Sequence, residues 1–285
     1  MTETTAAAAT AAPTLPAALR LGAVHITVTD LDRSVGFYQD AIGLQLHGRD
    51  GDVAAMGAGG EDLLVLHEAP FARAAGRHAG LYHFALLHPS REELARALVR
   101  LASTHTRIEG ASDHGISEAI YLPDPDGNGI ELAADRPRAA WPEGWDGRPD
   151  PLDLHALLRL VAGEEPRRHA DPGLVVGHLH LHVGDIERGL AFYRDIVGFE
   201  VQTLMPSAAF VSAGDYHHHL GFNIWRGPNV PPAPRGTVGL REWTVVLPAD
   251  GLAELLARLD AAGVAHEQGL TADPWGNAVR FVSAR

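Results

Sequence analysis

The sequence predicts an α+β protein of four βαβββ units, in which each unit contributes one strand, one helix and three further strands. Three observations indicate this fold class. A helix pattern that contains a Phe-Tyr pair occurs twice, about 155 residues apart. Each copy follows a short segment with the apolar pattern of a strand. Two weaker copies of the same strand-and-helix order fill the intervals, and both end in a turn built on Asp, Pro, Gly and Asn.

The two stronger copies can be aligned residue by residue. Residues 30–44 read D-L-D-R-S-V-G-F-Y-Q-D-A-I-G-L, and residues 185–199 read D-I-E-R-G-L-A-F-Y-R-D-I-V-G-F. Each segment begins with an Asp that can cap a helix, and each ends near a Gly that can stop one. We expect the Phe-Tyr pair of each segment to pack in the core rather than to form a site.

The four units account for most of the 285 residues. The weaker copies have expected helices at 91–102 and 251–262. Between the second and third units, a segment rich in Pro and Trp carries a short apolar helix around 152–161. The expected organisation is a disordered tail at 1–19, units at 20–69, 78–136, 173–226 and 237–285, and a linker at 137–172.

The composition excludes several classes of function. Acidic residues outnumber basic ones by 36 to 23, the formal charge is −13, and every basic residue is Arg. This balance argues against partners such as nucleic acid or an anionic membrane surface. The absence of Lys excludes Schiff-base chemistry, and the absence of Cys excludes disulfides and thiolate metal sites. The 17 histidines are therefore the only side chains that could supply nitrogen ligands to a metal.

The remaining composition bears on localisation. No apolar run approaches the ~18 residues that span a bilayer. The low-complexity N-terminal segment lacks the basic start and the apolar centre of a secretory signal. We therefore expect a cytoplasmic protein with no membrane partner. The oligomeric state is not set by these patterns, and a homo-oligomer stays open.

One stretch of the second unit suggests a metal. Residues 114–131 read H-G-I-S-E-A-I-Y-L-P-D-P-D-G-N-G-I-E, which indicates a strand, a tight turn and a second strand. Glu131 then lies in the middle of an apolar strand, where a carboxylate is costly unless it is paired or bound to a cation. The alternative is a Glu on the solvent-facing side of a half-exposed strand.

The four units and this stretch together resemble a known superfamily. Four βαβββ units are typical of the vicinal oxygen chelate superfamily, which includes glyoxalases, bleomycin-resistance proteins and extradiol dioxygenases. The pattern H-x5-[apolar]-Y-x2-D-P-x-G-x3-E is similar to the extradiol dioxygenase signature, and its three functional positions fall on His114, Tyr121 and Glu131. The strings G-L-Y-H-F-A-L-L and G-D-Y-H-H-H-L-G-F-N-I-W further resemble a four-module catechol 2,3-dioxygenase subfamily. Members pair two units into a curled sheet around a divalent metal.

The resemblance implies a ligand set. Extradiol members hold Fe(II) with two His and one Glu, an arrangement that leaves coordination positions open. His83 and Glu131 occupy two of these positions within the second unit. The third ligand lies on the opening strand of the partner unit, seven residues before the helix Asp. In the third unit that residue is His178, whereas in the first it is Ala23, with His25 as the only replacement nearby.

The distribution of these ligands predicts which units pair. In the fourth unit Glu242 stands where His83 stands, and Arg280 stands where Glu131 stands, so this unit cannot bind a cation in the same way. These two residues could instead form an ion pair. Only the second and third units together carry a full set. We therefore expect two curled-sheet half-barrels, one of units two and three that binds metal, and one of units one and four that does not.

Other polar residues are candidates for the chemistry. Within the triple at 217–219, His218 aligns with the acid/base histidine of extradiol enzymes, although a shift by one residue would bring in His217 or His219. By the same resemblance, His114 and Tyr121 would donate hydrogen bonds to bound substrate or oxygen.

Two more histidines accompany His178 on its strand. Strand alternation places His180 and His182 on the same face as His178, so either could face the substrate or be the ligand instead. Each strand histidine taken singly could also be an ordinary core residue.

The predicted function is Fe(II)-dependent extradiol cleavage of a small aromatic diol by O2, which gives a muconic semialdehyde-type product. Mn(II) stays open because it accepts the same ligands. Two alternatives remain. One is a glyoxalase-type lyase or isomerase, and the other is a metal-free protein that binds an aromatic ligand.

Overall fold

A computed structural model describes residues 14–142 and 148–284 as two β-sheets flanked by helices. The predicted tail lies outside the described residues as far as residue 13. Its last part was predicted wrongly, because Leu15 and Leu19 are buried and the Leu15 amide donates to the carbonyl of Gly198. No helix in the described ranges is both long and apolar enough to cross a bilayer.

The first sheet joins the first and fourth units. It has seven strands in the described residues, in the order β15 (Leu270–Ala272), β16 (Ala278–Ser283), β14 (Gly239–Leu247), β1 (Arg20–Val28), β4 (Asp62–Glu68), β3 (Val53–Gly57) and β2 (Gln45–Asp50).

The second sheet joins the third and second units. Its nine described strands run in the order β11 (Glu200–Met205), β12 (Ala208–Ser212), β13 (Leu220–Asn223), β10 (Val175–His182), β5 (Gly80–His88), β8 (Gly129–Asp135), β7 (Ser117–Pro123), β6 (Gly110–Asp113) and β9 (Asp150–Pro151).

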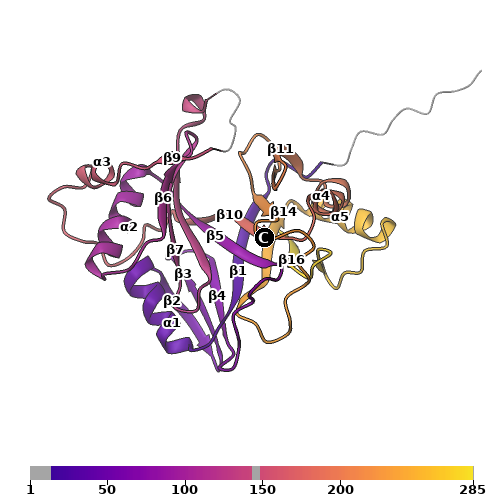
Figure 1. The fold of residues 1–285 in the computed structure, drawn as a ribbon, viewed down its shortest axis with the longest axis horizontal. Helices are drawn as coiled ribbons and strands as arrows, with labels where there is room; N and C mark the ends of the chain where they lie inside the picture. The colour runs from indigo at the N-terminus through magenta and orange to yellow at the C-terminus, as the bar shows by residue number, and fades with distance from the viewer. Residues whose placement is uncertain (1–13, 143–147, 285) are drawn as a thin grey trace, which may run out of the picture.

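The two sheets confirm the predicted pairing of units. Strand β1 pairs antiparallel with β14, and β10 pairs antiparallel with β5, so one sheet is continuous across the first and fourth units and the other across the second and third. In Figure 1 β2 and β6 lie on the left, β11 lies on the right, and β1, β5, β10 and β14 lie near the centre between them. The α+β fold class is likewise confirmed.

Helices pack outside the sheets. Both helices of the stronger repeat begin as α-helix and continue as π-helix, and the Tyr of each Phe-Tyr pair is fully buried, as expected. The described helices are α1 (Leu31–Phe37), η1 (Tyr38–Ile42), α2 (Arg91–Ser103), η2 (Arg138–Ala140), α3 (Leu154–Arg159), α4 (Ile186–Leu190), η3 (Ala191–Val197) and α5 (Ala249–Ala261).

Hydrogen bonds between helix and turn join the units that are neighbours in sequence. The Tyr38 hydroxyl of the first unit donates to Asp124 of the second at 3.1 Å, and Tyr193 of the third donates to Asp273 of the fourth at 3.1 Å. Each Asp also accepts hydrogen bonds from backbone amides of its own turn. The turns that were predicted from Asp, Pro, Gly and Asn therefore close two pairs of units as well as two hairpins.

Two details differ from the sequence prediction. The fourth unit has only two strands after its helix, β15 and β16, because residues 263–269 form a loop with one isolated bridge, Glu267 to Leu270. The linker contributes a short strand, β9, which pairs with β6 at the edge of the second sheet. Strand β9 extends this sheet beyond the second and third units.

Candidate metal centre and active-site cavity

Three adjacent strands bring His83, Glu131 and His178 together. Ala85 of β5 is aligned with Glu131 of β8 on one side and with His178 of β10 on the other, so the three side chains lie on one face of the sheet. His83 is two residues before Ala85 on that same face. One ligand atom from each of the three polar residues lies within 4.8 Å of the others. The small side chain of Ala85 leaves room between Glu131 and His178.

The electrostatics of these residues suit a cation. All three side chains are buried, and Glu131 Oε2 lies 3.0 Å from His83 Nε2 and 3.1 Å from His178 Nε2. Burial alone raises the pKa of the Glu131 carboxyl, but the two imidazoles outweigh burial and hold that pKa well below its usual value. Burial lowers the pKa of His83 despite the opposing effect of Glu131. An ionised carboxylate thus faces a neutral imidazole.

One atom indicates that the set is incomplete without a metal. His83 Nε2 is buried, yet it has no hydrogen-bond partner of acceptable geometry among the described residues. Such an atom is costly unless it binds something else. A lone pair on His83, the carboxylate of Glu131 and His178 form the two-His, one-carboxylate set that transition metals accept. The residues present therefore fit a divalent metal, with room on its open side.

The cavity beside these residues contains every site residue predicted from the sequence. Its volume is 620 Å³, which lies within the usual range for cavities that bind small molecules. Its polar walls include His114, Tyr121 and His218 together with the three candidate ligands. Its apolar walls come from residues that the sequence analysis did not single out, namely Ile116, Met205, Phe210 and Trp225.

His114 and Tyr121 are hydrogen-bonded to each other, with 2.9 Å between His114 Nε2 and the Tyr121 hydroxyl. Tyr121 is aligned with Glu131 on the next strand, which places its ring beside the candidate metal ligands. Burial and the charge of Glu131 raise the pKa of Tyr121, so its hydroxyl keeps its proton. Burial lowers the pKa of His114. This pair can therefore exchange hydrogen bonds with an oxygen of a bound ligand.

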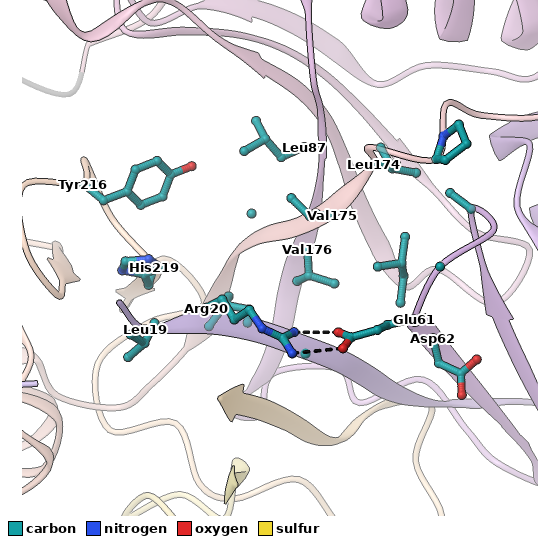
Figure 2. Close-up of a pocket in the computed structure, with 17 residues that line it drawn as sticks. Leu19, Arg20, Glu61, Asp62, Leu87, Leu174, Val175, Val176, Tyr216 and His219 are labelled. Carbon is teal, nitrogen blue, oxygen red and sulfur yellow. Dashed lines mark hydrogen bonds and ion pairs between the residues drawn. The ribbon is translucent and has the colours of Figure 1, made fainter. Parts of the chain in front are cut away.

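The histidine triple separates in space. His218 lines the cavity, with its ring centroid 4.2 Å from that of His178. His219 instead lines a second cavity, of 320 Å³, beside Tyr216 and Val176 (Figure 2). The triple lies in the loop before β13 rather than in a strand, so strand alternation is not the cause of this separation.

A β-bulge places a further aromatic residue at the cavity. His180 pairs with His83 and Leu181 pairs with Leu81, so Tyr82 is an extra residue on β5. The Tyr82 ring lies 4.8 Å from that of His83 although the two are adjacent in sequence. His180 also lines the cavity, in agreement with the expectation that it could face the substrate. It is hydrogen-bonded to Asn223. Simple alternation would have placed Tyr82 on the opposite face.

Comparison with known proteins identifies the fold family. The family model described as the glyoxalase/bleomycin resistance protein/dioxygenase superfamily matches residues 20–132 and 175–283. This chain belongs to that superfamily. A curated relative, the catechol-2,3-dioxygenase of Bacillus subtilis (strain 168), is 43% identical over 258 residues, which cover 87% of this chain and 90% of the relative.

Solved structures of the superfamily fold agree with the architecture. Glyoxalase I from Zea mays superposes with a TM-score of 0.58 at 18% identity, covering 93% of this chain and 92% of that one. The cppA protein from Streptococcus pneumoniae TIGR4 superposes with a TM-score of 0.56 at 15% identity, covering 93% of this chain and 100% of that one. At these identities the likeness concerns the fold alone.

The half-barrel of the first and fourth units lacks the cation-binding residues. Arg280 donates to both oxygens of Glu242, at 2.7 and 3.0 Å, and thus forms the ion pair considered from the sequence. His25 contacts His67, with 3.1 Å between their ring nitrogens. His25 belongs to β1 of the first sheet, whereas His83, Glu131 and His178 belong to the second sheet. Within residues 14–142 and 148–284, His83, Glu131 and His178 are the one group of three arranged to hold a metal.

Proposed function

We propose that this protein is a metal-dependent extradiol dioxygenase that cleaves a catechol-type ring with O2. The single observation that carries the proposal is the convergence of His83, Glu131 and His178 beside one cavity that also contains His114, Tyr121 and His218. The relative at 43% identity is a catechol-2,3-dioxygenase, which supports the same chemistry. Fe(II) is the proposed metal, and Mn(II) suits the same ligands.

The candidate ligands, which line the cavity, would hold the metal there. When bound, a divalent metal would supply Lewis-acid activation of the diol and bring the diol and O2 together. His83 and His178 supply imidazole nitrogens, and Glu131 supplies the negative charge. A catechol and O2 together contain all the atoms of the muconic semialdehyde-type product, so no further reductant is required.

His218 is the proposed proton acceptor. Burial first, and the neighbouring histidines second, lower the pKa of His218 well below its usual value, so the ring is neutral at neutral pH. A neutral imidazole in this cavity can take a proton from a diol hydroxyl and return it later in the reaction. The Phe210 ring packs edge-on against the His218 ring, with 5.1 Å between the ring centroids.

Tyr121 and His114 are proposed to orient the diol. Nδ1 of His114 is buried without a hydrogen-bond partner among the described residues, which favours the tautomer that carries its proton on Nε2. His114 Nε2 then donates to the Tyr121 oxygen, and the Tyr121 hydroxyl, which interacts with Glu131, can donate its hydrogen to a ligand oxygen instead. This bond would fix the diol against the metal.

Anaerobic loading with Fe(II), followed by catechol and then air, tests the proposal. A yellow ring-fission product, with O2 consumed in a one-to-one ratio to catechol, is the expected result. Turnover of a methylglyoxal–thiol adduct without O2 uptake would favour the lyase or isomerase alternative. Tight binding of catechol that is unaffected by a chelator, with no product, would favour the metal-free binding protein. Either of the last two outcomes would overturn the proposal.

A further inference from the structure

A chain of three polar residues, of which the two histidines are buried, leads from the end of β8 to the cavity. His217 Nε2 lies 3.1 Å from Asp135 Oδ1, and His217 Nδ1 lies 2.7 Å from His218 Nδ1. Asp135 is four residues after Glu131 on β8, and an even spacing along a strand keeps both on the same face. The loop that carries the two histidines packs over that face.

Asp135 is well placed to anchor this loop. Its second oxygen, Oδ2, accepts a hydrogen bond from the Tyr216 hydroxyl at 3.0 Å, so both carboxylate oxygens are used by adjacent residues of the loop. The ring of Tyr216 stacks close to that of His217, with 4.0 Å between centroids. The His217 side chain is 3% exposed. The ring of His217 therefore has little freedom to turn.

The direction of each hydrogen bond follows from the chemistry of its partner. A carboxylate only accepts hydrogen bonds, so His217 must carry its proton on Nε2. With that as its one ring proton, His217 presents a lone pair on Nδ1. The short contact at 2.7 Å requires a proton between the two rings, and that proton must belong to Nδ1 of His218. His218 would thus have its lone pair on Nε2.

We infer that Asp135 and His217 are positioning residues, which hold His218 in the tautomer with its proton on Nδ1 and its lone pair on Nε2 toward the cavity. The inference rests on the proposed function for its catalytic meaning. A carboxylate that sets the tautomer of a histidine base is a known way to orient such a base. Here a second imidazole lies between the carboxylate and the base.

Two variants of His217 form a matched pair. In His217→Gln, the amide can donate to Asp135 and its oxygen can accept from His218, so the direction of both bonds is kept. In His217→Leu, both bonds are lost. We expect kcat to fall by roughly 10- to 100-fold in His217→Leu and by less than about threefold in His217→Gln, with KM and metal content little changed in both. His219→Asn, which alters the adjacent histidine on the other cavity, is the control.

A second measurement does not depend on activity. The ¹⁵N chemical shifts of the imidazole nitrogens, recorded on the full chain with chelator present, report which nitrogen of His218 carries the proton. We expect Nδ1 to carry it in the unaltered protein and in His217→Gln, and the preference to be lost in His217→Leu. A proton on Nε2 of His218 in the unaltered protein would overturn the inference even if the enzyme cleaves catechol.

The kinetic and spectroscopic results separate the two claims. If no ring-fission activity is found but the expected tautomer is, the proposed function fails and the positioning of His218 stands. If activity is found and His217→Leu keeps its kcat, the positioning claim fails. Equal losses of kcat in His217→Gln and His217→Leu would also contradict it, because His217→Gln can keep both hydrogen bonds and His217→Leu can keep neither.

Discussion

His178 Nε2 lies 3.1 Å from Glu131 Oε2, although the two residues are 47 positions apart and belong to different units. Strand β5 lies between their strands, and the small side chain of its Ala85 leaves room for this contact. The contact therefore depends on the pairing of the second unit with the third.

His178→Ala should abolish stable metal binding, because it removes one of three ligands. After anaerobic loading with Fe(II) and removal of free metal, we expect less than about a tenth of the metal per chain found in the unaltered protein, since even an outer-sphere change can lower affinity 10- to 100-fold. Metal analysis gives the readout. His182→Ala is the matched control, because His182 lies on the same strand but does not line the cavity. Full occupancy in His178→Ala would contradict the ligand set.

Gly129→Ala should displace Glu131. A Cβ atom at Gly129 would lie 2.0 Å from the backbone oxygen of Tyr82, so β8 and β5 would have to separate locally. We expect a loss of about 1–3 kcal/mol in the free energy of unfolding and at least ~10-fold weaker metal binding. Urea unfolding and metal titration measure these. Gly36→Ala is the control, because a Cβ there meets nothing within 4 Å and the residue lies inside α1.

His88 should make the fold sensitive to acid. Both of its ring nitrogens are buried without hydrogen-bond partners among the described residues, and burial lowers the pKa of His88 to about 3. The unfolded chain takes up a proton below pH ~6.5 while the folded one does not. This residue therefore contributes full stability above pH ~6.5, and the contribution is lost as the pH falls from there to about 3.

His88→Leu should reduce that sensitivity. Between pH 6.5 and pH 5 the unaltered protein should lose about 2 kcal/mol through His88, at 1.36 kcal/mol per pH unit. We expect the variant to lose that much less, as measured by urea unfolding at pH 7 and pH 5 with chelator present. His155→Gln, at an exposed histidine, is the control for removing a histidine. An unchanged difference between the two pH values in His88→Leu would contradict the prediction.

Arg280→Met should destabilise the half-barrel of the first and fourth units without changing metal content. The hydrogen bonds from Arg280 outweigh burial and lower the pKa of Glu242, so the carboxylate is ionised and would lose its partner. We expect a loss of roughly 1 kcal/mol in unfolding free energy for this partly exposed pair. Most of the loss should be regained when Glu242→Gln is added. We expect one metal per chain in every variant. Loss of metal in Arg280→Met would show that the half-barrel of the first and fourth units affects the site.

Much of the site could be predicted because its residues are marked in the sequence. Glu131 is a carboxylate within an apolar strand, and His83 and His178 occupy equivalent strands of repeated units. The same positions in the other units hold Ala23, Glu242 and Arg280, so the ligand positions implied by the resemblance to extradiol enzymes predicted the pairing of the units, and the two sheets confirmed it.

Other features depend on contacts that no local pattern records. Tyr82 reaches the cavity only because a bulge in β5 changes the register against β10. His218 faces the cavity and His219 faces away because of a loop whose path is held by Asp135, more than 80 residues earlier. The loss of a strand from the fourth unit was also not visible in its apolar pattern.

The sequence by itself determined the repeated units, the residues able to bind a cation and, through their uneven distribution, which units share a sheet. Those properties depend on residue type and spacing, which are local. Only the tertiary structure decided which side chains face one cavity, how His217 connects Asp135 to His218, and how closely Tyr38 and Asp124 join neighbouring units. The physical reason is that hydrogen-bond direction and strand register are set by residues distant in the chain, and these meet only when the two sheets have formed.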